Sequence, residues 1–343
     1  MVINVLVMIH GMIPVSSRFS SGDEAETHFD EYSSFWESIK QEKPELETLF
    51  ASGFSHEDGE QNLNFIGVEW GEDPENGAEI TENHQLLTKA QEFVNKRVAY
   101  KNLKSLNEPN NVILKPLDFP NHPLALARNI LVGLREDIVT AGFGDVIYYS
   151  SEEGEKEVRR TVYGQVLEQL DRFLDEPEVR LHLIGQSLGV TITHDFLYGL
   201  FNKKGEGDFV CEHQGTKESE RRYKLWREKA DIGELKLGSL TSTASQLPLF
   251  VMRSKELVER LANEKTIEAA NIGISDTNKV QWQLFYDVDD ILGFASRRLY
   301  DSENAIKDIQ VDSSDDPSKA HTKYWENETV IKETAKLLLA NAR

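Results

Sequence analysis

The segment RLHLIGQSLGV, residues 180–190, decides the fold of this 343-residue chain. It begins as a run of apolar, β-favouring residues, passes through the pattern G-x-S-x-G, and continues into residues of helical period. In this context the pattern is typical of a serine held on a sharp turn between a strand and a helix. Gly185 and Gly189 remove side chains where such a turn brings backbones together, and Gln186 stands beside the serine. We therefore predict that Ser187 is a nucleophile.

Short apolar runs alternate with longer segments of helical period on both sides of this turn. Such alternation predicts an α/β protein with a mostly parallel central sheet and helices on both faces. We expect strands at residues 2–9, 63–70, 146–149, 179–184, 235–241, 280–286 and 306–311. We expect helices at residues 85–106, 123–140, 155–174, 190–201, 249–262 and 324–340. Residues 1–343 are predicted to form a single domain.

An activated serine needs hydrogen-bond donors for the oxyanion that forms during acyl transfer. The backbone N–H of Leu188, directly after the nucleophile, is one predicted donor, aided by the positive end of the following helix. The first strand ends in His10 and Gly11, and a glycine there lets the chain turn so that the N–H of Met12 faces the same cleft. We interpret His10 as a structural residue that forms hydrogen bonds within this loop.

The base for such a serine is a histidine after the last strand, and the acid precedes it on a neighbouring strand end. Of the nine histidines, only His213 and His321 follow the nucleophile outside its own helix. His213 lies in a charged segment, whereas His321 lies between the last apolar run and the final helix. We therefore predict that His321 is the base.

Three carboxylates, those of Asp287, Asp289 and Asp290, crowd the end of the strand that precedes the last one. The strand end before that, residues 240–245, contains no carboxylate. We predict that Asp290 is the acid because the apolar Ile-Leu-Gly turn that follows would bury its flank. Asp289 is the second candidate and Asp287 the third. The two that are not the acid are expected to cap a helix that begins near residue 291.

Taken together, these features resemble the α/β-hydrolases of the esterase and lipase type. The matching residues are the His10-Gly11 strand end, the turn at 185–189, Asp290 in a D-x-D-D-I-L-G sequence, and His321 before Tyr324 and the terminal helix. The resemblance covers nearly the whole chain apart from residues 19–61 and 202–233. The chain departs from many relatives at Gln186, where they have histidine, a side chain that the hydroxyl chemistry does not require.

This resemblance implies a serine carboxylesterase that hydrolyses neutral acyl esters through an acyl-enzyme intermediate. Ser187 would attack the acyl carbonyl, His321 would take its proton, and the N–H groups of Leu188 and Met12 would hold the oxyanion. No cofactor and no metal ion is implied, and the expected partner is a small-molecule ester. The alternatives are a lipase or thioesterase of the same fold, and a non-catalytic scaffold of that fold that binds a small ligand or a protein.

The composition excludes several other classes of partner. The chain carries 38 basic and 59 acidic residues, a net charge of −21, and such a surface repels polyanions, so we expect no nucleic acid as partner. No apolar run approaches the roughly 20 residues that span a bilayer. Cys211 is the only cysteine, and the apolar opening lacks the basic region of a secretory signal, so we expect a cytoplasmic location.

Two regions do not follow the alternation of strands and helices. Residues 19–62 form an acidic excursion, and between residues 19 and 84 eighteen acidic residues stand against two basic ones. We interpret it as a solvated excursion on the rim, long enough to form a cap or lid that would disfavour anionic substrates. Residues 202–233 are dense in both charges and are interpreted as a surface insertion, half loop and half amphipathic helix.

Overall fold

The computed structural model describes residues 2–11, 28–55, 61–68, 149–202, 217–251, 255–275, 278–290, 292–314 and 317–343. Several of the sequence predictions fall outside these ranges, namely the helices at 85–106 and 123–140, strand residues 146–148, Met12 and His213. Within the described ranges, no helix is both long enough and apolar enough to cross a membrane.

Six parallel strands form the central sheet, in the order β4-β1-β5-β6-β7-β8. They are β1 (Val2–Ile9), β4 (Phe65–Val68), β5 (Glu178–Gln186), β6 (Leu235–Thr243), β7 (Trp282–Tyr286) and β8 (Ile306–Gln310). Each strand coincides with one of the predicted apolar runs, which confirms the α/β class. The near-continuous apolar sequence of β1 is typical of a strand buried on both faces, and all but its first residue are buried.

Of the predicted strand at residues 146–149, the structure describes Tyr149 alone, and there the prediction is wrong. Tyr149 and Ser150 are helical and lead into α6 (Glu152–Leu170). Ser151 caps the start of α6, because its hydroxyl accepts a hydrogen bond from the N–H of Gly154. A short apolar run has the same composition in a buried strand and in a buried helix, so periodicity alone does not separate the two.

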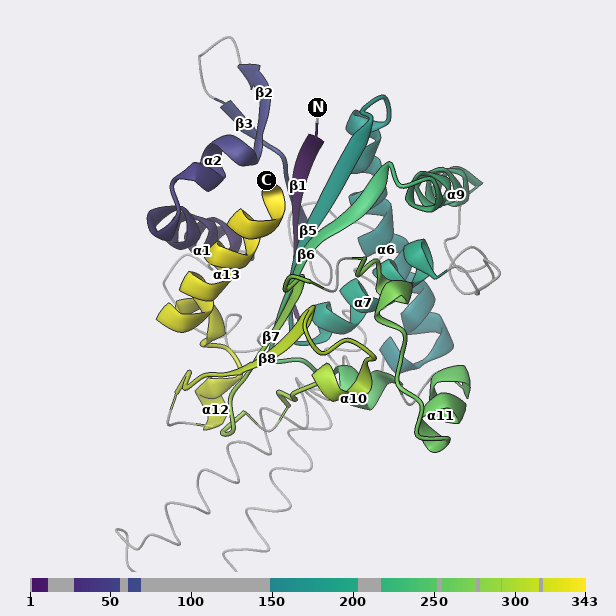
Figure 1. Ribbon diagram of the computed structural model, residues 1–343, viewed down its shortest axis with the longest axis vertical. Helices are drawn as coiled ribbons and strands as arrows, with labels where there is room; N and C mark the ends of the chain where they lie inside the picture. Colours follow the sequence, from purple (N-terminus) through teal and green to yellow (C-terminus); the bar gives the residue numbers. More distant parts are fainter. Residues whose placement is uncertain are drawn as a thin grey trace, which may run out of the picture.

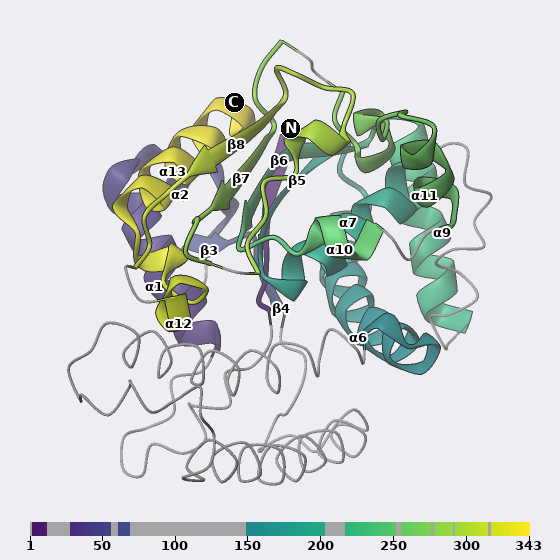
Figure 2. The same ribbon diagram turned by 90° about the horizontal axis from the view of Figure 1, so that it is seen from below.

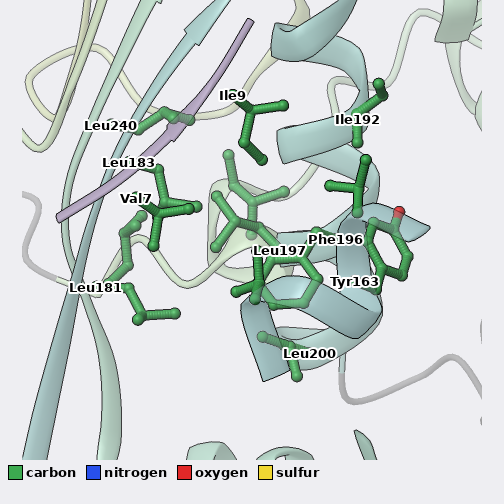
Figure 3. Packing of buried hydrophobic residues seen from close by; sticks show 14 of the residues in the cluster. Val7, Ile9, Tyr163, Leu181, Leu183, Ile192, Phe196, Leu197, Leu200 and Leu240 are labelled. Carbon is green, nitrogen blue, oxygen red and sulfur yellow. The ribbon is translucent and has the colours of Figure 1, made fainter. Parts of the chain in front are cut away.

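One face of the sheet is covered by α6, α7 (Leu188–Phe201) and α9 (Lys217–Asp231) (Figure 1; Figure 2). Helix α7 is apolar on most of its circumference and is buried along most of its length, next to the strands. Figure 3 shows how its side chains pack between the sheet and α6. The labelled residues are Val7, Ile9, Leu181, Leu183 and Leu240 from the strands, Ile192, Phe196, Leu197 and Leu200 from α7, and Tyr163 from α6.

The opposite face is covered by α1 (His28–Glu42), α2 (Glu45–Leu49) and α13 (Glu328–Ala342) (Figure 1; Figure 2). Tyr32, Phe35 and Trp36 are buried there, and the ring of Phe35 stacks on that of Trp325 with the centroids 5.1 Å apart. A solvated excursion is therefore the wrong description of residues 28–50, which form a layer of the fold. The acidic side chains between residues 31 and 47 are exposed on the outer side of this layer.

The region that follows α2 forms a hairpin that the sequence analysis did not anticipate. Its strands, β2 (Ala51–Ser55) and β3 (Gln61–Leu63), pair with each other in antiparallel fashion and lead directly into β4. The short, mixed sequence of these strands lacks the alternation of apolar and polar residues that identifies a half-buried strand.

The predicted surface insertion at residues 202–233 contains α9, and residues 203–216 lie outside the described ranges. Tyr223 and Trp226 on α9 are fully buried and belong to the core. The inner side of this helix therefore contributes to folding, although most of its sequence is charged.

Two predicted helices differ from their expected bounds. In place of the helix expected at 249–262, the described residues form α10 (Leu247–Phe250) and α11 (Lys255–Ala262), and residues 252–254 lie outside the described ranges. The helix expected at 324–340 begins as a 3-10 turn, η8 (Tyr324–Glu326), and α13 starts only after Asn327, whose Oδ1 accepts hydrogen bonds from the N–H groups of Thr329 and Val330. The other short elements are α12 (Pro317–Ala320), η4 (Asp171–Phe173), η6 (Ala269–Ile272) and η7 (Arg297–Leu299).

Candidate active site

Ser187 occupies the turn between β5 and α7, as the sequence predicts. Its backbone has φ 53° and ψ −124°, in a region that residues with a side chain rarely adopt. The turn is held in place because the N–H of Ser187 donates to the carbonyl of Thr243 on the neighbouring strand β6, at 2.9 Å. Strain of this kind persists where the surroundings fix the backbone, and it is typical of functional sites.

The glycines of the predicted motifs lie where backbones approach closely. A Cβ at Gly189 would lie 2.3 Å from the carbonyl oxygen of Ile9, and a Cβ at Gly11 would lie 2.5 Å from Cβ of Ser187. Gly185 is also tight, with Cα of Val190 3.0 Å from the position of its missing Cβ. The end of β1 and the serine turn are therefore packed directly against each other, with Gln186 half-buried at the end of β5.

His321 joins the predicted serine to the predicted acid. Its Nε2 lies 2.8 Å from Oγ of Ser187, and its Nδ1 lies 2.9 Å from Oδ1 and 3.0 Å from Oδ2 of Asp290. An ionised carboxylate only accepts hydrogen bonds, so Nδ1 carries the proton and Nε2 is free to accept the hydroxyl proton of Ser187. The three side chains come from residues after β5, β7 and β8, whose carboxyl ends share one edge of the parallel sheet.

The carboxylate of Asp290 is almost completely buried, with 1% of the side chain exposed against 19% for His321. It accepts hydrogen bonds from the N–H of Leu292 at 2.9 Å and from the hydroxyl of Tyr324 at 3.0 Å, in addition to those from His321. Burial by itself raises the pKa of this carboxyl group, but the bond from His321, the imidazolium charge and the other two donors outweigh it and lower the pKa. Asp290 is therefore held in its ionised form beside the imidazole.

Asp287 and Asp289, the other two candidates for the acid, form no hydrogen bond with His321 among the residues that the structure describes. Asp287 is buried and accepts hydrogen bonds from the backbone N–H groups of Asp289 and Ser313, so it fastens the loop after β8 to the end of β7. The side chain of Asp289 is exposed. The expectation that these residues cap a helix near residue 291 is wrong for Asp287, whose carboxylate closes a turn. Of the three candidates, Asp290 alone is hydrogen-bonded to His321 within the described residues.

The predicted oxyanion donors are described only in part. Leu188 is the first residue of α7, and the first N–H groups of a helix have no partner within the helix, so its N–H is suited to an oxyanion beside Ser187. Met12 lies outside the described residues. His10 is buried, its Nδ1 lies 2.6 Å from the carbonyl oxygen of Gly11, and its N–H donates to the hydroxyl of Tyr32. These are contacts within the loop and with the helical layer.

Two side chains next to Ser187, His321 and Asp290 were not assigned a role from the sequence. Tyr324 donates to Asp290 while its hydroxyl accepts the N–H of Asp287, and both burial and the nearby Asp290 charge raise its pKa above the ordinary value. Gln246 donates from Nε2 to Oγ of Ser187 at 3.1 Å. Gln246 directly follows residues 240–245 at the end of β6, which contain no carboxylate, so charge does not mark this strand end. An uncharged donor at a strand end was the available signal.

Among the residues that the structure describes, no three His, Cys, Asp or Glu side chains are arranged to hold a metal ion.

The chain was compared with known proteins. It matches no protein-family model, no curated protein and no solved structure.

Proposed function

We propose that this protein is a serine hydrolase of the α/β-hydrolase fold that cleaves neutral carboxylic esters. The observation that carries the proposal is the continuous hydrogen-bond chain from Ser187 through His321 to the buried carboxylate of Asp290. Nucleophilic acyl transfer requires a base within hydrogen-bond reach of the nucleophile and a third group that orients the base. The order serine, acid, histidine along the chain supports the fold assignment.

In the proposed reaction, Oγ of Ser187 bonds to the acyl carbon while its proton passes to Nε2 of His321. The charge of Asp290 stabilises the imidazolium that forms. The N–H of Leu188, together with that of Met12, donates to the oxyanion. Collapse of the tetrahedral intermediate expels the alcohol, which takes the proton from His321, and a water molecule activated by His321 then releases the acid.

The net charge of −21 supports neutral rather than anionic substrates, because a negative surface repels anions on approach. A lipase or a thioesterase would use the same triad. The length of the acyl chain and the atom that leaves, oxygen or sulfur, distinguish these activities from that of a carboxylesterase. Parallel assays with p-nitrophenyl esters of increasing chain length and with an acyl thioester separate the three.

Ser187→Ala tests the proposal. With a short-chain p-nitrophenyl ester, the wild-type protein should release a burst of p-nitrophenol, and the variant should lose at least about 10⁴-fold in kcat because the nucleophile is gone. Equal and negligible rates in the two proteins would instead support a non-catalytic scaffold and end the enzyme proposal.

A further inference from the structure

Gln246 follows β6 and is completely buried beside the nucleophile. Its Nε2 lies 3.1 Å from Oγ of Ser187, on which His321 also converges at 2.8 Å. The side chain of Gln246 therefore touches the atom that attacks the substrate in the proposed reaction.

Counting protons fixes the orientation of this amide. The hydroxyl of Ser187 has a single hydrogen, and that hydrogen is directed at Nε2 of His321 because Nδ1 already donates to Asp290. Oγ can then only accept from Gln246. A reversed amide would place Oε1 against the lone pairs of Oγ with no hydrogen between them, so the amide nitrogen faces the nucleophile.

Oε1 of Gln246 is buried and has no hydrogen-bond partner among the described residues. An unsatisfied buried acceptor destabilises a fold by about 1–3 kcal/mol. Gln283 shares this feature, so what distinguishes Gln246 is the contact of its Nε2 with Oγ of Ser187.

We propose that the side-chain amide of Gln246 is an additional donor of the oxyanion hole. This inference rests on the proposed hydrolase function. When Oγ bonds to the acyl carbon, it loses its proton to His321 and becomes an ester-like oxygen, a weaker acceptor. The carbonyl electron pair moves at the same time to the oxygen on that same carbon, and this oxyanion becomes the strongest acceptor within reach of Nε2. A donor whose bond strengthens as charge develops lowers the barrier.

The competing role for Gln246 is to position the free hydroxyl of Ser187. The two roles differ in the second half of the reaction. Deacylation passes through another tetrahedral oxyanion but starts from an esterified serine, which has no hydroxyl to position. An oxyanion donor therefore accelerates both acylation and deacylation, whereas a positioning residue accelerates acylation alone.

The experiment measures both phases with a short-chain p-nitrophenyl ester, the burst rate for acylation and the steady-state rate for deacylation. The variants are Gln246→Met, which keeps the volume but removes the donor, and Gln246→Glu, which keeps the shape. The matched control is Gln283→Met, because Gln283 on β7 is also buried and its Oε1 also lacks a partner within the described ranges.

We expect both Gln246 variants to lose about 10²-fold or more in each phase with KM little changed, and Gln283→Met to retain both rates. Two variants are used so that a folding defect in one leaves the other to decide. A slower burst with an unchanged steady-state rate would overturn the inference in favour of positioning, and unchanged rates in both phases would overturn it outright. Wild-type protein without Ser187-dependent ester hydrolysis would instead overturn the hydrolase function, and the inference with it.

Discussion

Two trios of serine, histidine and an Asx side chain lie in the described part of the chain, one at the carboxyl edge of the sheet and one within it. At the edge, His321 joins Ser187 to Asp290. Within the sheet, Nδ1 of His182 lies 2.8 Å from Oγ of Ser239, and its Nε2 lies 3.1 Å from Oδ1 of Asn4. In both trios an imidazole joins a serine hydroxyl to an Asx side chain, but the surroundings differ greatly.

The proton lies on the opposite nitrogen in the inner trio. The amide nitrogen of Asn4 donates to the carbonyls of Leu49 and Ala342, so its oxygen faces the imidazole and accepts from Nε2 of His182. Nδ1 then accepts from Ser239. Burial, followed by the charges of Arg180 and Lys279, lowers the pKa of His182 to about 3. This imidazole is therefore neutral at physiological pH and cannot act as a base that ends the step protonated.

The comparison teaches that the hydrogen-bonded trio alone does not make a triad. The edge trio has a full negative charge behind its imidazole and a histidine that is partly exposed. The inner trio has a neutral amide and no exposure at His182. Charge and access separate a site suited to chemistry from a polar connection that holds strands and helices together.

Asp290→Asn should give the largest effect in this comparison, because it makes the edge trio chemically equivalent to the inner one. The amide favours the wrong tautomer of His321 and cannot stabilise the imidazolium, so kcat should fall by about 10⁴-fold. Steady-state ester hydrolysis measures the change. Asp287→Asn is the control and should lose far less, and the reverse order would identify Asp287 as the triad acid.

His182→Leu should lower the free energy of unfolding by about 3 kcal/mol. The change leaves the oxygen of Asn4 and the hydroxyl of Ser239 buried without the partner that His182 provides. Urea unfolding measures this, with His321→Leu as the counterpart. That variant should lose activity while its stability changes much less. Similar stability losses in both would show that the inner trio has no special structural role.

The free energy of unfolding should fall as the pH is lowered, because His182 binds a proton more readily in the unfolded chain. An unfolded histidine has a pKa of roughly 6.5, so this contribution is complete above that pH and is lost as pH falls toward about 3. Between pH 7 and pH 5 this group should lower the free energy of unfolding by about 2 kcal/mol. Urea unfolding at the two pH values should give a shallower decline in His182→Gln, and an identical decline would mean that His182 does not titrate differently on unfolding.

Tyr324→Phe should give the smallest effect, about a tenfold loss of kcat. Asp290 keeps its bonds from His321 and Leu292, but it loses the donor that helps to orient it and to keep it ionised. The matched control is Tyr163→Phe, since the buried hydroxyl of Tyr163 has no hydrogen-bond partner among the described residues. Equal rates in Tyr324→Phe and Tyr163→Phe would show that Tyr324 does not position Asp290.

Local pattern was sufficient to predict six strands and to choose Ser187, Asp290 and His321 as residues that meet. Such pattern is informative because parallel strands end at one edge, so residues that follow different strands converge there. It was insufficient in two places. Tyr32, Phe35, Trp36 and Ile39 recur at helical spacing, but the dense acidic residues around them favoured a solvated segment. The strand assigned to Tyr149 failed because a short apolar run suits a buried strand and a buried helix equally.

Gln246 was missed for a chemical reason. Charged side chains at strand ends are recognisable as candidates for a triad, whereas a neutral amide acts only through its position. No sequence pattern gives the distance of an amide from a serine 59 residues away.

The bonds of Asn4 also bear on how the fold forms. Its amide donates to the carbonyl of Ala342, 338 positions along the sequence, so β1 gains this partner only when α13 docks. Contacts of such separation form slowly and late. Until then water solvates the amide of Asn4, and the last turn of α13 completes the burial of this side chain in β1.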